Sequence, residues 1–275
     1  MATIREIIQH RSQFIDSFEL GHRVQVNLLE EVYRLGRSMA KNLPDDPAKY
    51  TLFQDLLAIA LVRTVNRLES ILILLRVGNP VECAILLRSI FDDLINVLYI
   101  EKNPGLRTLL FARQEVNDYL RFLRRRVQKD AAEQARYTTE MQDYVGKVSE
   151  YDKEISKISP GFKIPKGKDW SGKNIREMAE AAGLAEGYDH MYWELSGITH
   201  SLATSSKYFV RADHRGRFQP VFYPHDEPSK WLAEFAALHS LFILNTVDKN
   251  IGAGKARAIN QLKKRIQRIT LLTQN

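Results

Sequence analysis

Apolar residues recur at intervals of three and four along most of the chain, which is the pattern of amphipathic helices. Two adjacent segments, 51–77 and 80–102, are apolar on most faces and are separated by a Gly-Asn-Pro break. A helix that is apolar all round is usually buried, so we expect this pair to form the centre of a bundle. Further helices are predicted over 2–41, 105–158 (two long helices with a break near 129–132), 174–183, 186–206, 228–250 and 255–272.

Residues 207–224 carry the one convincing β pattern, in which two short β-prone runs flank the turn sequence of residues 213–216. The predicted fold class is therefore all-α: a helical bundle with two long projecting helices and one small β-hairpin. We expect three parts in the chain: N-terminal helices over 1–50, a bundle core over 51–254, and a basic C-terminal helix over 255–275. The core includes the helical arm 105–158 and the hairpin 207–224.

Composition supports a globular helical protein. Of the 275 residues 44% are apolar and 27% are charged, which excludes a disordered or collagen-like chain. The single cysteine, Cys83, excludes a disulfide framework and any cysteine-based zinc or iron–sulfur site within one chain. A net charge of +7 permits anionic partners without requiring them.

The most apolar stretch does not predict a membrane span. It runs from Leu56 to Leu75 and is interrupted by Arg63, Arg67 and Glu69, whereas a span needs about 20 consecutive apolar residues. Charges are spread through the first 18 residues, which is unlike a secretory signal. We therefore expect a cytoplasmic protein with no integral membrane segment.

The first candidate for chemistry lies on the central helix 80–102. Arg88 and Asp92 are four residues apart, so they share a face of a helix that is otherwise largely apolar. One interpretation is a structural ion pair, because charges are costly to bury unless they are paired. The other is an arginine that Asp92 holds in a pocket to bind an anion such as phosphate.

The second candidate is a polar ridge on the later helix. Tyr192, Ser196 and His200 repeat every four residues, and the free pKa of histidine near 6.5 suits His200 to general acid–base work. Ser196 would orient a substrate group and is a poor nucleophile candidate, since no oxyanion-hole motif surrounds it. The alternative is a helix-packing ridge in which His200 bonds to a carbonyl group.

Other motifs carry less information. Arg5 and His10 match the arginine–histidine spacing of some ribonucleases, but a chain of this arginine content gives about two such matches by chance. We find no metal-binding motif and no glycine-rich phosphate loop, so we expect no metal and no cofactor.

Basic residues gather in three places: on the arm around 121–129, in the loop 160–174, and on the C-terminal helix. In the loop, Lys166 and Lys168 lie close to Trp170, and basic residues beside aromatic ones suit RNA or single-stranded nucleic acid. We take these three residues and Tyr192 as candidate substrate-binding residues. The alternatives are a solvated charged face and, for the C-terminal helix, packing on a partner subunit or an anionic membrane.

The two central motifs resemble a bacterial family of uncharacterised all-helical proteins. That family carries Arg-Ser-x-x-Glu on a core helix and Ser-x-x-x-His on a later one, and here the pattern falls on Arg88, Asp92, Ser196 and His200. The family is similar to the HEPN group of helical domains, many of which are ribonucleases in toxin–antitoxin and phage-defence systems. The resemblance covers about residues 50–210, and Asp92 replaces the more usual glutamate.

Three functions remain open at this point. The resemblance implies a HEPN-like ribonuclease of a bacterial defence or toxin system. It would act without a metal, with His200 as acid–base and Arg88 stabilising charge on the phosphate. The second is a non-catalytic binder of RNA or a nucleotide that uses the same pocket. The third is an interaction module whose arm and C-terminal helix build a homo-oligomer such as a dimer.

Overall fold

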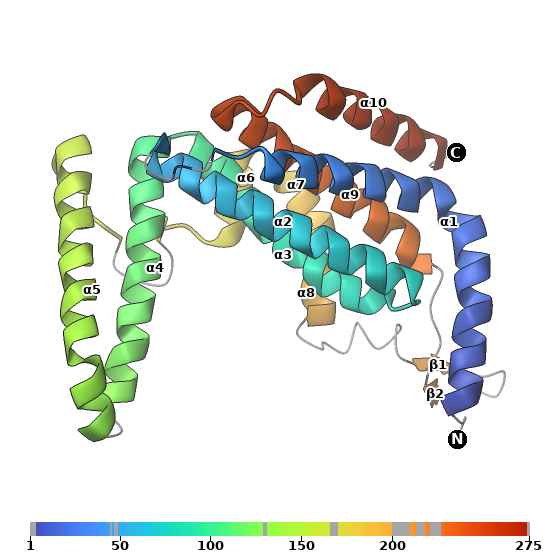
Figure 1. Ribbon diagram of the computed structural model, residues 1–275, viewed down its shortest axis with the longest axis horizontal. Helices are drawn as coiled ribbons and strands as arrows, with labels where there is room; N and C mark the ends of the chain where they lie inside the picture. The colour runs from blue at the N-terminus through green and yellow to red at the C-terminus, as the bar shows by residue number, and fades with distance from the viewer. Residues whose placement is uncertain are drawn as a thin grey trace.

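The computed structural model describes residues 4–44, 46, 49–128, 131–165, 170–199, 210–212, 218–220 and 227–273 (Figure 1). Nearly all of them are helical, so the all-α fold class is confirmed. The elements in chain order are α1 (Ile4–Lys41), α2 (Leu52–Arg76), α3 (Pro80–Glu101), α4 (Pro104–Val127), α5 (Ala131–Ile158), α6 (Ile175–Ala182), α7 (Ala185–Gly187), the π-helical turn η2 (Tyr188–Tyr192), α8 (Trp193–Thr199), β1 (Val210–Ala212), β2 (Phe218–Pro220), α9 (Glu227–Ile251) and α10 (Ala256–Thr273).

The core of the molecule is a bundle in which α2, α3 and α9 pack against one another. α1 lies against α2 and α9, and α10 crosses over α9 on the outside (Figure 1). Leu61 of α2, Leu87 of α3 and Leu244 of α9 are fully buried. The two apolar helices predicted to form the centre of the bundle do so, because neither has a polar face broad enough to meet water.

The ends of these helices follow from local sequence. The Thr51 hydroxyl accepts the N–H of Gln54, whose side chain accepts the N–H of Thr51 in return, which fixes the start of α2. Pro80 stands at the beginning of α3, where its missing N–H costs no helical hydrogen bond. Asn174 and Glu177 cap the start of α6 in the same reciprocal way as Thr51 and Gln54.

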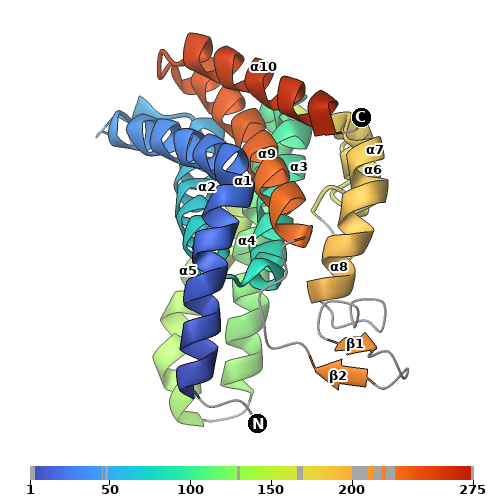
Figure 2. The ribbon, with the colours of Figure 1, turned by 90° about the vertical axis from the view of Figure 1, so that its right-hand side faces the viewer.

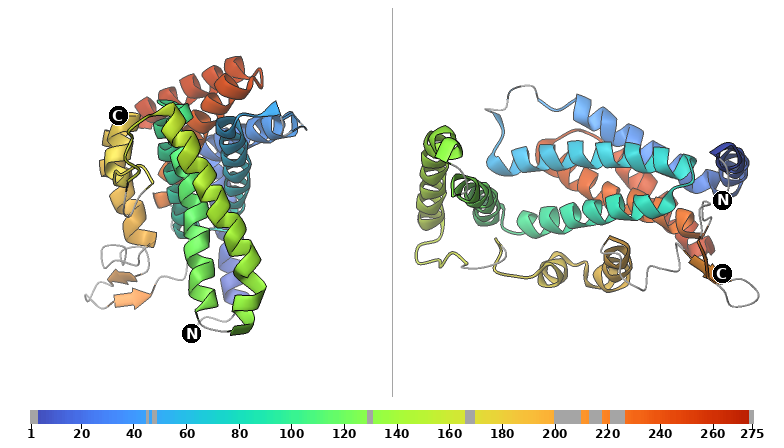
Figure 3. Two further views of the ribbon diagram at one scale, coloured as in Figure 1. Left: turned by 90° about the vertical axis from the view of Figure 1, so that its left-hand side faces the viewer. Right: turned by 90° about the horizontal axis from the view of Figure 1, so that it is seen from below.

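The long helices α4 and α5 form an antiparallel pair at one end of the bundle (Figure 1). They pack mainly on each other, and α4 makes a smaller contact with α2 and α3. Seen from below, the pair stands at the end of α2 and α3 rather than alongside them (Figure 3). This end of the bundle is where α2, α3 and α4 meet.

The segment from α6 to α8 covers α3 on the side away from α2 (Figures 2 and 3). Both α6 and α8 contact α3, and η2 leads directly into α8. Within the predicted hairpin region, Val210–Ala212 pairs antiparallel with Phe218–Pro220, and Arg211 stands opposite Gln219. The rest of 207–224 lies outside the described residues.

Candidate functional site

Arg88 is the centre of a polar cluster between α3 and the η2–α8 segment. It lies among apolar residues of α3, and its side chain is only 15% exposed. Its Nη2 donates a hydrogen bond to the hydroxyl of Tyr192 at 2.8 Å, and its Nη1 donates one to the hydroxyl of Ser196 at 3.2 Å. The guanidinium carbon also lies 4.7 Å from the centre of the Tyr192 ring. Two segments about 100 residues apart therefore meet at one guanidinium group.

The four-residue spacing of Tyr192 and Ser196 explains why both reach Arg88. Their spacing through η2 and α8 puts them one turn apart on the face that packs on α3. Tyr188 lies one turn earlier and stacks on Tyr192, with ring centres 4.3 Å apart and an interplanar angle of 17°. Burial, with smaller contributions from Tyr192 and Asp92, raises the pKa of Tyr188 to about 12. Tyr188 is therefore neutral at neutral pH.

Asp92 completes the cluster. Its Oδ2 lies 3.9 Å from Nε of Arg88, and its Oδ1 is buried with no hydrogen-bond partner among the described residues. Burial raises the pKa of Asp92 above its ordinary value; Arg88 opposes this effect and the Asp93 carboxylate adds to it. An unpartnered buried carboxyl oxygen beside a guanidinium is a place where a ligand hydroxyl could bind.

The other predicted site residues fall elsewhere. His200, Lys166 and Lys168 lie outside the described residues, as do the side chains of Arg5 and His10. Trp170 packs edge-on against Tyr99 and Phe111, with ring centres 5.6 and 5.3 Å away, and contacts the hydrophobic core. These contacts are those of a packing residue that fastens the loop to α3 and α4.

A second polar cluster, which the sequence did not reveal, lies on the other face of α3. Asp93 accepts a short hydrogen bond from Arg67 and pairs with Arg63 at 3.2 Å, and its side chain is 11% exposed. Arg67 also donates to the carbonyl oxygen of Ser89 at 3.3 Å. The available signal was the four-residue spacing of Arg63 and Arg67 in an otherwise apolar helix. That spacing places both arginines on one face of α2, and because charges are costly to bury without a partner, a carboxylate is expected opposite them.

His239 of α9 is a further buried polar residue that no motif indicated. Its ring stacks on Phe91 with centres 4.7 Å apart, and its Nδ1 has no hydrogen-bond partner in the described part of the chain. Burial lowers the pKa of His239 to about 3, so the ring is neutral at physiological pH. His239 is therefore a packing residue of the core, and burial makes protonation of its ring unfavourable.

Metal and thiol chemistry find no support in the described residues. Among them, no group of three or more His, Cys, Asp or Glu side chains is arranged to hold a metal ion. Cys83 is buried, and burial raises the pKa of its thiol, so little of the nucleophilic thiolate forms. In this part of the chain, no helix combines the length and apolar character needed to cross a bilayer.

The fold and the site define an all-helical bundle with a largely buried arginine held by two hydroxyl groups and a carboxylate. The chain belongs to a family of unknown function, DUF5677, whose model matches residues 54–217. That range contains both polar clusters on α3 and the whole η2–α8 segment, whereas α1, α9 and α10 lie outside it. Comparison with curated proteins gives no match, and comparison with solved structures gives none either.

Proposed function

We propose that the Arg88 cluster binds a phosphate group of RNA or of a nucleotide, and that the protein is a metal-independent ribonuclease of the HEPN-like type. The observation that carries the proposal is the double hydrogen bond from Arg88 to the Tyr192 and Ser196 hydroxyls. A guanidinium flanked by hydroxyl groups matches the donors that bind phosphate oxygens in nucleic-acid complexes. The chain's excess of basic residues agrees with an anionic partner.

The surroundings of Arg88 favour RNA over a simple anion. Tyr188 and Tyr192 are half-buried, stacked aromatic rings, and unstacked RNA bases bind to such surfaces. The unpartnered Oδ1 of Asp92 could accept a hydrogen bond from a ribose 2′-hydroxyl, the group that distinguishes RNA from DNA. Phosphate, base and sugar would thus each have a matching group within one cluster.

In the proposed reaction, His200 removes the proton of the 2′-hydroxyl, and the resulting oxygen attacks the neighbouring phosphorus. The bond to the 5′-oxygen breaks, this oxygen takes up a proton, and a 2′,3′-cyclic phosphate remains on the upstream strand. Arg88 stabilises the negative charge that grows on the phosphate oxygens. Ser196 and Tyr192 orient the guanidinium, and Asp92 positions the attacking sugar. No metal ion takes part in these steps.

The test incubates the wild-type protein, His200→Ala and Arg88→Lys with total RNA, tRNA and single-stranded DNA, each with Mg²⁺ and with a chelator. Cleavage of RNA by the wild type in chelator, with cyclic phosphate ends, supports the proposal. Both variants should then lose at least 100-fold in rate, because each removes a group that acts on the reacting phosphate. Arg34→Lys changes an exposed arginine in the same way and should cleave like the wild type. Absence of cleavage in every condition would overturn the catalytic proposal.

The α4–α5 arm favours a second candidate, a non-catalytic module that binds nucleic acid or a second copy of the chain. Phe122 and Val145 are 42% and 48% exposed on the arm, so each leaves apolar surface that a partner could cover. The C-terminal helix is less suited to assembly, since Ile259, Leu262 and Ile266 are buried within the chain itself. RNA binding that weakens steeply with salt but gives no cleavage would indicate a nucleic-acid binder. A molecular mass in solution that rises with protein concentration, and that no longer rises in Phe122→Glu, would indicate assembly through the arm.

A further inference from the structure

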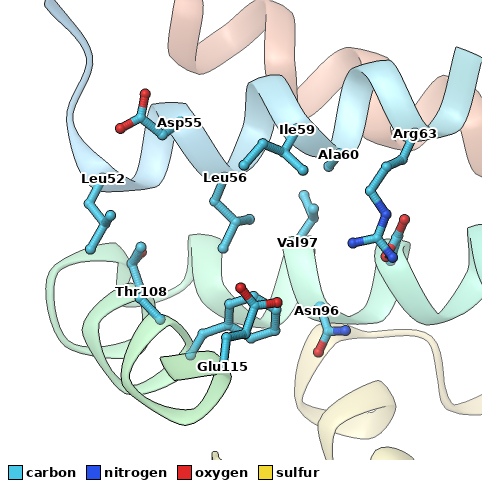
Figure 4. Close-up of a pocket in the computed structure, with 13 residues that line it drawn as sticks. Leu52, Asp55, Leu56, Ile59, Ala60, Arg63, Asn96, Val97, Thr108 and Glu115 are labelled. Atoms are coloured by element: carbon cyan, nitrogen blue, oxygen red, sulfur yellow. The ribbon is translucent and has the colours of Figure 1, made fainter. Parts of the chain in front are cut away.

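A separate cavity of about 130 Å³ lies where α2, α3 and α4 meet (Figure 4). Its walls are largely apolar and come from all three helices; they include Leu56, Ile59, Ala60, Val97 and Phe111. Engineered cavities of about 150 Å³ with similar walls hold a benzene molecule, and this space is slightly smaller, so a ligand's ring would fill it and the rest of the ligand would lie at its mouth. The cavity faces α2 and α4, whereas the Arg88 cluster faces α8, and the two sites share only α3.

One end of the cavity is polar and carries both signs of charge. Arg63 reaches down from α2, Asn96 lies below it on α3, and Glu115 turns its carboxylate from α4 toward the same space (Figure 4). Arg63 pairs with Asp93, which also binds Arg67. Arg63 and Arg67 are thus balanced by Asp93 and Glu115, and the net charge of this end is close to zero. A ligand at this end would meet the guanidinium of Arg63 and the carboxylate of Glu115.

Glu115 differs from the other three charged groups. Arg63 and Arg67 each form an ion pair with Asp93, whereas Glu115 interacts with Arg63 through longer-range attraction. Partial burial raises the pKa of Glu115 above its ordinary value, and Arg63 opposes the rise. Glu115 keeps an exposed side, and a ligand cation beside its carboxylate would add an attractive charge interaction.

Thr108 supplies a buried hydroxyl group at the opposite end of the cavity. It lines the cavity near Leu52, it is 2% exposed, and its hydroxyl has no hydrogen-bond partner among the described residues (Figure 4). Buried hydroxyl groups nearly always have a partner in folded proteins.

We propose that this cavity binds a free aromatic α-amino acid, with the carboxylate at Arg63, the ammonium group at Glu115 and the ring between α2, α3 and α4. A zwitterion matches the polar end because it adds both charges and leaves the local sum unchanged. A simple amine would meet only Glu115 and a simple acid only Arg63, so each would gain only one of the two charge interactions. The ring takes the place of solvent against Leu56, Val97 and Phe111.

The experiment measures binding by calorimetry to the full-length protein of L-phenylalanine, L-tyrosine, phenethylamine and 3-phenylpropionate. Phenethylamine lacks the carboxylate and 3-phenylpropionate lacks the ammonium group, so each should bind at least tenfold more weakly than the amino acids. Glu115→Gln should weaken the binding of the amino acids about tenfold and leave the binding of 3-phenylpropionate unchanged. Ala112→Phe places a ring in the cavity wall and should abolish binding of all four.

Two controls separate this site from the rest of the molecule. Glu150→Gln removes an exposed carboxylate from α5 and should bind like the wild type. Arg88→Lys should also bind like the wild type, because the proposal does not depend on the Arg88 cluster. Absence of amino-acid binding at millimolar concentration overturns the proposal. Equal binding of the amino acids and their singly charged analogues overturns it as well, and so does unchanged amino-acid binding by Glu115→Gln.

Discussion

Asp92 and Asp93 are consecutive residues of α3, yet their carboxylates face different arginines. Asp92 lies 3.9 Å from Arg88 beside the η2–α8 segment, and Asp93 pairs with Arg63 and Arg67 of α2. Successive residues of a helix are about 100° apart around its axis, so the two neighbouring carboxylates point to different faces of α3. α3 therefore holds the Arg88 cluster on one side and the polar end of the cavity on the other.

Asp93 should be the more important of the two carboxylates for stability. Asp93→Asn leaves Arg67, which is 18% exposed, without its counter-charge, and it removes the partner of Arg63. We expect a loss of about 2–3 kcal/mol in the free energy of unfolding, less than for a fully buried pair because water reaches Arg63. Urea unfolding measures this change. Asp118→Asn breaks the exposed pair with Arg121 and should cost less than about 0.5 kcal/mol; equal losses in the two variants would contradict the prediction.

The hydrogen bond from Arg88 to Tyr192 should appear as an energetic coupling. A double-mutant cycle with Arg88→Met and Tyr192→Phe should give about 1–2 kcal/mol, because a hydrogen bond to a charged group is worth more than a neutral one. Unfolding in urea of the four proteins supplies the cycle. Tyr188→Phe is the matched control, since Tyr188 stacks on Tyr192 but no hydrogen bond joins it to Arg88 in the described contacts. A coupling no larger than in this control would show that the bond contributes nothing.

The sequence predicted the helices well because strong local signals mark their ends. The predicted segments 51–77 and 80–102 each end within one residue of the observed ends of α2 and α3. Thr51, Pro80 and the Asn103-Pro104 pair are strong local signals that start or stop a helix. The meeting of Arg88 with Ser196 was also within reach, because each lies on a polar stripe of an otherwise apolar helix. The roles proposed for them in catalysis remain predictions.

Contacts between distant segments could not be predicted from the sequence. Asp93 and Arg67 are 26 residues apart on different helices, and only the crossing of α2 and α3 decides that they meet. Trp170 stood beside lysines in the sequence and so suggested substrate binding, whereas its ring packs between Tyr99 and Phe111. Proximity along a loop says little about which way a large side chain turns, because burial of its apolar area determines the direction.

Two glycines in helices should respond in opposite ways to substitution. A Cβ atom at Gly36 of α1 would lie 3.0 Å from Val65 and 3.4 Å from Leu244, so α1 approaches α2 and α9 closely at this point. Gly36→Leu should therefore cost about 2–3 kcal/mol through overpacking. Gly146 of α5 has nothing within 4 Å, and Gly146→Ala should add about 0.5–1 kcal/mol through helix propensity. Thermal unfolding compares the two variants, and a stabilising Gly36→Leu would refute the close packing of α1.

His239 should make the fold sensitive to acid. Burial lowers its pKa from 6.5 to about 3, so between these values the unfolded chain binds a proton that the folded protein does not. Stability is then lost as the pH falls from 6.5 toward 3, by at most about 1.4 kcal/mol for each pH unit. His239→Phe removes the titrating group and keeps a ring that can stack on Phe91. Relative to the wild type, this variant should gain about 2 kcal/mol between pH 7 and pH 5. Parallel pH profiles of unfolding free energy for the two proteins would show that His239 does not titrate as its burial requires.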